Sequence, residues 1–319
     1  MKYRFAVAAI LAVVMTFAIC ACTENPGPSG TNKPAGTGTP SETAGADDPS
    51  TLPQIEASDK FTKFDTTIAY NPAECTKIKL AQDATTVEGD GVTIEGNKIT
   101  IGKAGSYIVT GTLTDGQIFV SVEKTEKVRL ILAGVSVTNK SQAAIYVASA
   151  DKVGITLASG TENVLTDGTK YTGLNEKDEP TGCLFSKDDL TINGYGSLTV
   201  NGNYNNGIAS KNDLKIVSGN ITVTAKNNAI KGKDSFMMNS GTLVVNSDDD
   251  GIKVNEDEDI SKGFICIEGG TITVNAEDDA LTAVYSVTIT GGTVTTYVGG
   301  KAVNCTGTVN IASGCLIEK

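Results

Sequence analysis

The chain has 319 residues, with 26 lysines and arginines against 37 aspartates and glutamates, so its formal net charge is −11. This balance argues against nucleic-acid binding, because such a protein needs cationic side chains that neutralise phosphates. Histidine is absent, which excludes Ser-His-Asp or Cys-His catalysis and metal sites that depend on imidazole. With 35 glycines and few helix-forming stretches, the composition predicts a turn-rich β protein that works outside the cell.

The first residues of the chain have the pattern of an export signal. Lys2 and Arg4 precede an apolar run from Phe5 to Ile19, which is typical of a signal peptide and short for a membrane span. The run leads into Ala21-Cys22, which resembles the end of a bacterial lipoprotein signal. We expect a lipoprotein signal peptide over residues 1–21, lipidation of Cys22, and anchoring on the extracellular face of the bacterial membrane. The alternative is an ordinary secretory signal.

Residues 22–55 are rich in Pro, Gly, Ser and Thr and contain almost no large apolar side chain. Such a segment cannot bury enough apolar surface to fold, so we predict a disordered tether. The remaining residues, 56–319, contain only two prolines, Pro72 and Pro180. This favours stacked strands, because each proline removes one N–H group from a strand ladder.

Three apolar columns recur through the second half of the chain with a period near 22 residues. The first contains Leu198, Ile221, Leu243, Ile272, Val294 and Leu316, the second contains Ile208, Ile230, Ile252, Leu281 and Val303, and the third contains Leu214, Phe236, Ile265, Val287 and Val309. Each column has one gap of 29, and together these gaps place seven extra residues between Ile252 and Ile265. The insertion therefore lies in the acidic stretch 255–262.

Three short strands per repeat, without helices, predict an all-β solenoid of the parallel β-helix type, with about 22 residues per coil. Region 61–137 contains alternating strands without a clean period, and we assign it to an N-terminal β cap and the first coils. Stacked Ile, Leu and Val side chains form the predicted core, in which Phe236 and Met238 occupy the third strand of one coil.

Several runs in the repeat resemble the bacterial secreted carbohydrate-binding domain family, whose fold is a right-handed parallel β-helix. These runs are 143–146, 187–192, 210–216, 219–225 and 249–252. The resemblance implies a shape similar to pectate lyases, calcium binding, and binding of cellulose or acidic plant sugars. Where that family often has Asp before the Gly-Ile or Ala-Ile pair, this chain has Asn206 and Asn228.

A polar column precedes the second strand of each coil and becomes strongly acidic in two adjacent coils. Neighbouring coils stand about 4.8 Å apart, so stacked carboxylates repel each other unless a cation or water separates them. Hard oxygen ligands without imidazole or thiolate favour Ca²⁺. We predict a calcium site with ligands from this set: Asn228, Asp248, Asp249, Asp250, Glu256, Glu258, Glu277, Asp278 and Asp279. The alternative is a solvated acidic edge.

These observations leave more than one class of function open. The first is a non-catalytic, monomeric surface lipoprotein that binds polysaccharide with the help of calcium, either a uronate polymer such as polygalacturonate or cellulose. The second is a calcium-dependent polysaccharide lyase that cleaves uronate polymers by β-elimination, with Lys231 or Lys253 as the base. The third is a structural or adhesive stalk.

Overall fold

The structure, a computed structural model, describes residues 48–319. The predicted signal peptide, the lipidation site Cys22 and residues 22–47 of the predicted tether lie outside these residues. Among the described residues, no helix has the length and apolarity that crossing a membrane would need.

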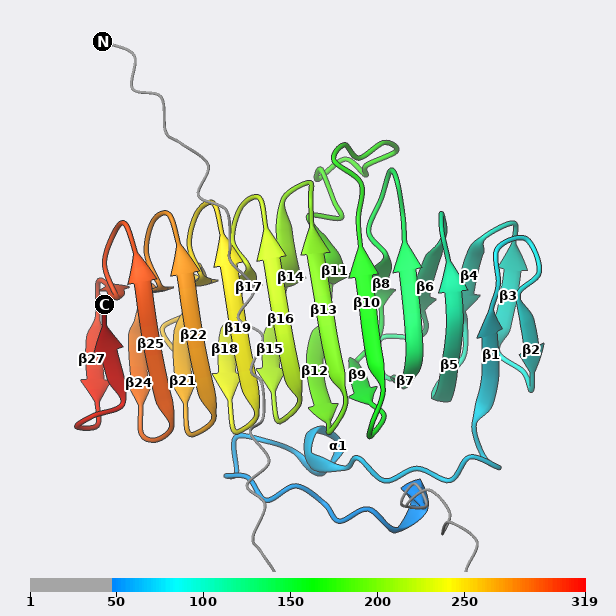
Figure 1. Ribbon diagram of the computed structural model, residues 1–319, viewed down its shortest axis with the longest axis horizontal. Coiled ribbons are helices and arrows are strands. Elements are labelled where there is room, and N and C mark those ends of the chain that lie inside the picture. The colour runs from blue at the N-terminus through cyan, green and yellow to red at the C-terminus, as the bar shows by residue number, and fades with distance from the viewer. Residues whose placement is uncertain (1–47) are drawn as a thin grey trace, which may run out of the picture. The chain divides into compact units, whose positions relative to one another are not determined.

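Almost all regular structure is β-strand, and the strands stack in parallel into an all-β solenoid with three rows (Figure 1). One row is a separate ten-stranded sheet, which we call the site row. Its strands are β3 (Val92–Glu95), β4 (Lys98–Ile101), β6 (Gln117–Ser121), β8 (Ile145–Ser149), β11 (Gly182–Ser186), β14 (Asn206–Ser210), β17 (Ile230–Gly232), β20 (Ile252–Val254), β23 (Leu281–Ala283) and β26 (Val303–Cys305).

The other two rows belong to one 18-stranded sheet, because the long strand β7 pairs with both. The front row contains β1 (Thr76–Leu80), β2 (Thr86–Glu88), β5 (Gly105–Leu113), β7 (Lys127–Thr138), β10 (Glu162–Thr166), β13 (Ser197–Gly202), β16 (Asn220–Ala225), β19 (Thr242–Ser247), β22 (Thr271–Ala276), β25 (Thr293–Val298) and β28 (Leu316–Glu318). The third row, the strap row, contains β9 (Lys152–Leu157), β12 (Asp189–Gly194), β15 (Asp213–Ile216), β18 (Ser235–Met238), β21 (Phe264–Ile267), β24 (Ser286–Ile289) and β27 (Thr308–Ile311).

Pairing in all three rows follows the columns that the repeat predicts. In the front row Leu198 pairs with Ile221, and in the site row Ile230 pairs with Ile252, 22 residues later. Ile252 pairs in turn with Leu281, 29 residues later, because the insertion lies between them. The right-handed sense of the coil and a constant coil length stay predictions.

The apolar columns point inward and form one continuous core. The residues of these columns from Leu198 to Val294 are at most 1% exposed, and Phe236 and Met238 are fully buried as predicted. Alternation along each strand turns the intervening side chains outward. The outer side of the site row is therefore a surface whose side chains stack at the strand spacing.

Two loops and the N-terminal end interrupt the regular stack. One loop, 167–181, joins β10 to β11, and the inserted loop, 255–263, joins β20 to β21. At the N-terminal end, β1 pairs with β2 and β3 pairs with β4 in the antiparallel sense. These are the antiparallel pairs among the described strands, and they close the end where stacked parallel strands begin.

Residues 48–70, which we call the strap, run along the lower edge of the strands in Figure 1. They contain a short 3₁₀-helix, η1 (Pro49–Thr51), and the one-turn helix α1 (Lys63–Thr66). The tether predicted over 22–55 was thus wrong for residues 48–55. Ile55 donates a backbone hydrogen bond to Thr66 and packs on an outward cluster of Val217, Met237 and Cys266. Apolar surface on the outside of the strap row therefore orders a segment that is mostly polar.

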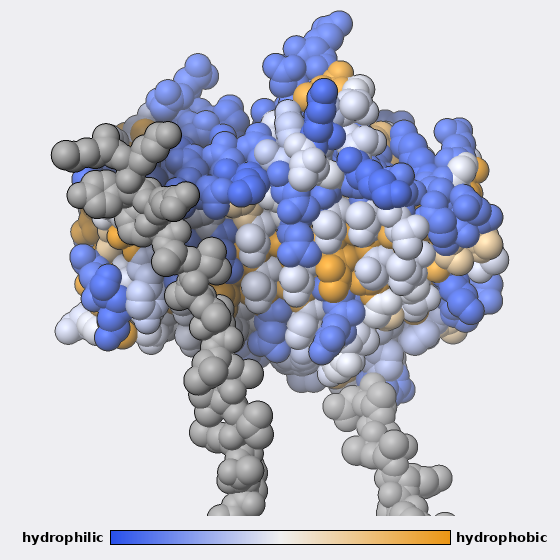
Figure 2. Space-filling view, turned by 45° about the horizontal axis from the view of Figure 1, so that its top comes forward, coloured by the Kyte–Doolittle hydropathy of each residue, from blue (hydrophilic) through white to orange (hydrophobic). Residues whose placement is uncertain are grey.

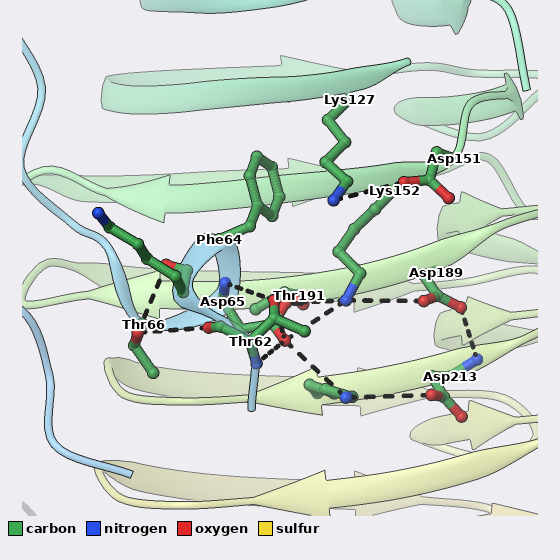
Figure 3. Close-up of polar contacts among 12 residues, drawn as sticks. Thr62, Phe64, Asp65, Thr66, Lys127, Asp151, Lys152, Asp189, Thr191 and Asp213 are labelled. Atoms are coloured by element: carbon green, nitrogen blue, oxygen red, sulfur yellow. Dashed lines mark hydrogen bonds and ion pairs between the residues drawn. The ribbon is translucent and has the colours of Figure 1, made fainter. Parts of the chain in front are cut away.

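A buried ionic cluster fastens the strap to the strap row (Figure 3). Asp65 is fully buried, with its carboxylate 3.0 Å from the Lys152 ammonium and 2.7 Å from the Thr191 hydroxyl. The Lys215 ammonium lies 3.8 Å from the same carboxylate. Because buried charges are costly without partners, each group in this cluster depends on the others.

Candidate functional site

The polar column lies in the turns that lead from the front row to the site row, at the top of Figure 1. The space-filling view shows hydrophilic residues gathered over this upper edge (Figure 2). These turns are held together by backbone bonds between rungs, such as Gly251 N–H to the Asp279 carbonyl at 2.9 Å. A Cβ atom on Gly251 would lie 2.3 Å from Val274 Cγ1 and 2.8 Å from the Ala280 carbonyl oxygen. Glycine is needed there because the turn packs so closely on the next rung.

In the earlier rungs the column consists of neutral amides that hydrogen-bond to one another. Asn227 donates to Asn205 Oδ1 at 2.8 Å, and Asn228 donates to Asn206 Oδ1 at 3.0 Å. Amides can stack in this way because each carries both a donor and an acceptor. Because these side chains are uncharged, they do not repel one another, in contrast to the carboxylates of the following rungs.

In the next two rungs three carboxylates converge. Oxygens of Asp249, Asp250 and Asp278 all lie within 4.8 Å of one another. Carboxylates this close together repel one another. The negative charge of Asp279 raises the pKa of the exposed Asp278 carboxyl, and desolvation and the charges of Asp250 and Asp249 add to this shift. The arrangement has the oxygen donors and the excess negative charge that attract a divalent cation.

Neighbouring groups hold the trio in position. Asp250 is 2% exposed; its Oδ1 accepts from the Asp279 N–H at 3.2 Å, and its Oδ2 lies 2.6 Å from the Lys253 ammonium. One rung earlier stands Asn228, also 2% exposed, whose Oδ1 is buried without a hydrogen-bond partner among the described residues. A buried carbonyl oxygen without a donor is unusual and is available to a cation.

Asp279 belongs to the same turn but is already engaged. Its Oδ1 accepts from the Lys301 N–H at 2.7 Å and its Oδ2 from Asn304 at 2.5 Å. Asp248 is half-exposed and forms an ion pair with Lys226 at 2.8 Å, and Glu277 is exposed. These three predicted ligands stand beside the trio of carboxylates rather than within it.

The acidic inserted loop is not brought to the trio. Glu256 follows β20, whereas Asp250 precedes it, so the two lie at opposite ends of that strand. The Glu256 carboxylate lies 2.7 Å from the Lys233 ammonium and accepts from the Glu258 and Asp259 N–H groups. It therefore organises its own loop, and the exposed Glu258 lies in that loop.

The outward column of the site row lies beside the trio, and sequence reasoning did not single it out. Consecutive rungs carry the side chains Phe119, Tyr146, Phe185, Ala209, Lys231, Lys253, Thr282 and Asn304. The three rings stack edge-on or tilted, with centroids 5.3 and 5.6 Å apart. Strand alternation was the signal that could have revealed this column, because these residues lie one position after the buried second column.

Two cavities follow this column. One, of about 200 Å³, is lined by Phe185, Ala209 and Lys231 and by the Asn side chains of the turns. The other, of about 360 Å³, is lined by Lys253, Thr282 and Asn304. Both are also lined by Asn255 of the inserted loop. We call these two neighbouring cavities, which lie along six rungs of the column, the site groove.

The two lysines proposed as bases differ in their surroundings. Burial lowers the pKa of Lys253, but the hydrogen bond and the negative charge of Asp250 outweigh this effect. The pKa of Lys253 is therefore raised. The pKa of Lys231 is lowered by burial and by the positive charges of Lys253 and Lys211. Of the two, only Lys231 is shifted toward the neutral amine that a general base requires.

Comparison with known proteins supports the all-β fold and indicates a family of carbohydrate-binding domains. A curated relative from Acetivibrio thermocellus, described as a carbohydrate-binding domain-containing protein, is 49% identical over 137 residues. That match covers 43% of this chain and 48% of the relative, so the chain spans about half the length of the curated relative that it matches.

A solved structure, described as the polysaccharide lyase-like protein from C. thermocellum in a gadolinium derivative, is 44% identical with a TM-score of 0.75. The match covers 77% of this chain and 100% of that one. The family model of the carbohydrate-binding domain-containing proteins matches residues 95–315. Most of the described solenoid and nearly all of its site row lie in that range, and the chain belongs to this carbohydrate-binding domain family.

Proposed function

We propose that this protein binds acidic polysaccharide without cleaving it, through a Ca²⁺ ion at Asp249, Asp250 and Asp278. The observation that carries this proposal is the convergence of three carboxylates within 4.8 Å, one of which, Asp250, pairs with Lys253 of the site groove. A cation there offsets their mutual repulsion and, because Ca²⁺ takes about six to eight ligands, keeps coordination positions open for the carboxylates of a uronate polymer. It explains how a protein of net charge −11 holds an anionic chain.

The donor set supports calcium over other ions. It consists of carboxylate oxygens, with the unpartnered Asn228 Oδ1 one rung away, and the chain has no histidine. Calcium accepts irregular oxygen shells that magnesium disfavours. The neighbour of known structure was solved as a gadolinium derivative, and gadolinium is another hard cation that prefers oxygen ligands.

The cellular setting of the proposal follows from the first residues of the chain. Signal-peptide cleavage before Cys22 and lipidation of its thiol would anchor a monomer at the extracellular face of the bacterial membrane. Residues 22–47 would form the tether. The right-handed solenoid would then present its site groove to polysaccharide outside the cell.

One observation favours a second candidate, a polysaccharide lyase. Lys231 lies in the site groove, two rungs from Asp278, and its pKa is lowered by burial and by two neighbouring lysines. A cation that binds the uronate carboxylate would acidify the α-proton, and Lys231 would remove it. The solved relative is described as polysaccharide lyase-like, which gives this candidate a precedent in shape.

The test is a binding isotherm on immobilised polygalacturonate, with calcium or with a chelator. Wild-type protein should bind in calcium and lose most of its affinity with chelator. The double variant Asp250→Asn, Asp278→Asn should behave like chelated protein, whereas Asp248→Asn, outside the trio, should bind like wild type. Equal binding by wild type and the double variant in calcium would refute the proposal. Sustained absorbance from an unsaturated product would replace it with the lyase.

A further inference from the structure

The smaller cavity of the site groove is lined by cations although the protein as a whole is acidic. Lys211, Lys231 and Lys233 line it together with amides of Asn205 and Asn227, and no acidic side chain does. Ala209 occupies the outward position between Phe185 and Lys231 in consecutive rungs. Because the Ala209 side chain is small, it leaves a cavity beside the aliphatic part of the Lys231 side chain.

Most ammonium groups around this cavity are neutralised by acidic partners. Lys211 lies 2.9 Å from the Glu179 carboxylate, and Lys233 lies 2.7 Å from that of Glu256. Lys253, in register with Lys231, lies 2.6 Å from that of Asp250. Among residues 48–319, no carboxylate oxygen lies within 4.0 Å of the Lys231 ammonium. Lys231 is thus a partly buried cation whose nearest register partner carries the same charge.

We infer that the cavity at Lys231 is a carboxylate subsite that takes one uronate group of the polysaccharide directly, without calcium. A single anionic group there would balance the one unneutralised ammonium. The neighbouring Asn205 and Asn227 amides offer donors and acceptors to sugar hydroxyls. Because a carboxylate carries one charge, it matches this site better than a phosphate dianion would. This inference rests on the proposed function, because it assigns a second contact to the same polymer.

The positions of the two subsites also determine how the polymer chain lies relative to the strands. Lys231 and the trio lie on the same side of the solenoid, with Asp250 one rung and Asp278 two rungs from Lys231. One rung is about 4.8 Å, so the two subsites are separated by roughly 5–10 Å along the solenoid axis. Uronate groups of one chain can therefore reach both subsites if the chain runs across the strands. A chain running parallel to the strands would leave the site row after three residues of β17 or β20.

The test separates the two subsites by removing each in turn. Binding to polygalacturonate is measured at low ionic strength with chelator, where the cation site contributes nothing, and again with calcium. Wild type should retain weak binding in chelator, and Lys231→Met should weaken it about tenfold or more, as expected for a lost charge-assisted hydrogen bond. Lys231→Arg keeps the charge and should bind within about threefold of wild type. Asp250→Asn, Asp278→Asn should keep the chelator-resistant binding.

Lys226→Met is the matched control, because Lys226 is an exposed lysine of the neighbouring turn paired with Asp248. It should leave binding unchanged. A fully methyl-esterified polymer, which lacks the carboxylates, should lose the contribution of Lys231. Equal affinities of wild type and Lys231→Met in both conditions, or no wild-type binding in chelator, would overturn the subsite while leaving the calcium proposal intact. Failure of wild type to bind in calcium as well would overturn the proposed function itself.

Discussion

Replacing Asp65 by alanine tests whether the strap is held by its buried charges. The carboxylate accepts from the Thr191 hydroxyl at 2.7 Å and the Thr62 N–H at 2.8 Å, and pairs with Lys152 at 3.0 Å. Without it, Lys152 and Lys215, each 6% exposed, remain buried with only more distant carboxylates. Removing one partner of a buried ion pair costs about 3–5 kcal/mol. Partial compensation by Asp189, 3.6 Å from Lys152, places the expected loss near the lower end of that range.

The assay is urea unfolding combined with limited proteolysis of the strap. The matched control is Asp59→Ala, an exposed aspartate of the same segment. Burial raises the pKa of Asp65, but the Thr191 hydrogen bond and the charge of Lys152 outweigh it, so the pKa lies below the ordinary 3.8. Its stabilisation is therefore present above pH 3.8 and is lost as the pH falls through the lower folded-state pKa. Equal unfolding free energies and proteolysis rates for the two variants would refute this account of the strap.

Three further changes test the core, a buried acid and the turn beside the trio. Burial raises the pKa of Asp167 from 3.8 to about 6; its destabilising effect therefore grows as the pH rises from about 4 to 6 and is complete above that, and Asp167→Asn should stabilise the protein at pH 7 by up to about 3 kcal/mol. Thermal melts at pH 5 and pH 7.5 check this, and an unchanged pH dependence would contradict it. Ile252→Ala should cost about 2–5 kcal/mol in urea unfolding, because Ile252 is fully buried in the second column; a loss below 1 kcal/mol would contradict the register. Gly251→Ala should cost about 1–3 kcal/mol, because its Cβ would lie 2.3 Å from Val274, and a melt like that of wild type would show that the turn can move.

Much of the fold could be predicted from the spacing of apolar residues. The period near 22 set the columns, and Ile230, Ile252 and Leu281 pair as that spacing requires. The strap could not be predicted in this way, because Asp65 and Lys152 are 87 residues apart and no local pattern joins them. The predicted tether extended too far, to residue 55, because the composition of this segment is polar. Its last residues, 48–55, are instead ordered by apolar surface on other strands.

The candidate site was only partly visible in the sequence. Stacking of equivalent turns brought Asp249, Asp250 and Asp278 together, because the repeat fixes which turns are neighbours. The same reasoning could not show that the Glu256 side chain pairs with Lys233. This ion pair depends on the path of the inserted loop, which has no counterpart in the other coils. The lysine-lined cavity depends equally on how loops close over the site row.

Calorimetric titration with calcium tests the central claim most directly. The wild-type protein should take up at least one Ca²⁺ at millimolar concentration or below, with about 2.7 kcal/mol of added stability at a hundredfold excess over the dissociation constant. Asp250→Asn, Asp278→Asn should abolish this uptake, because an amide oxygen at position 250 can still accept from the Asp279 N–H while the negative charges are lost. Asp248→Asn should take up calcium as wild type does. Absence of calcium uptake by wild type, or undiminished uptake by the double variant, would contradict the account.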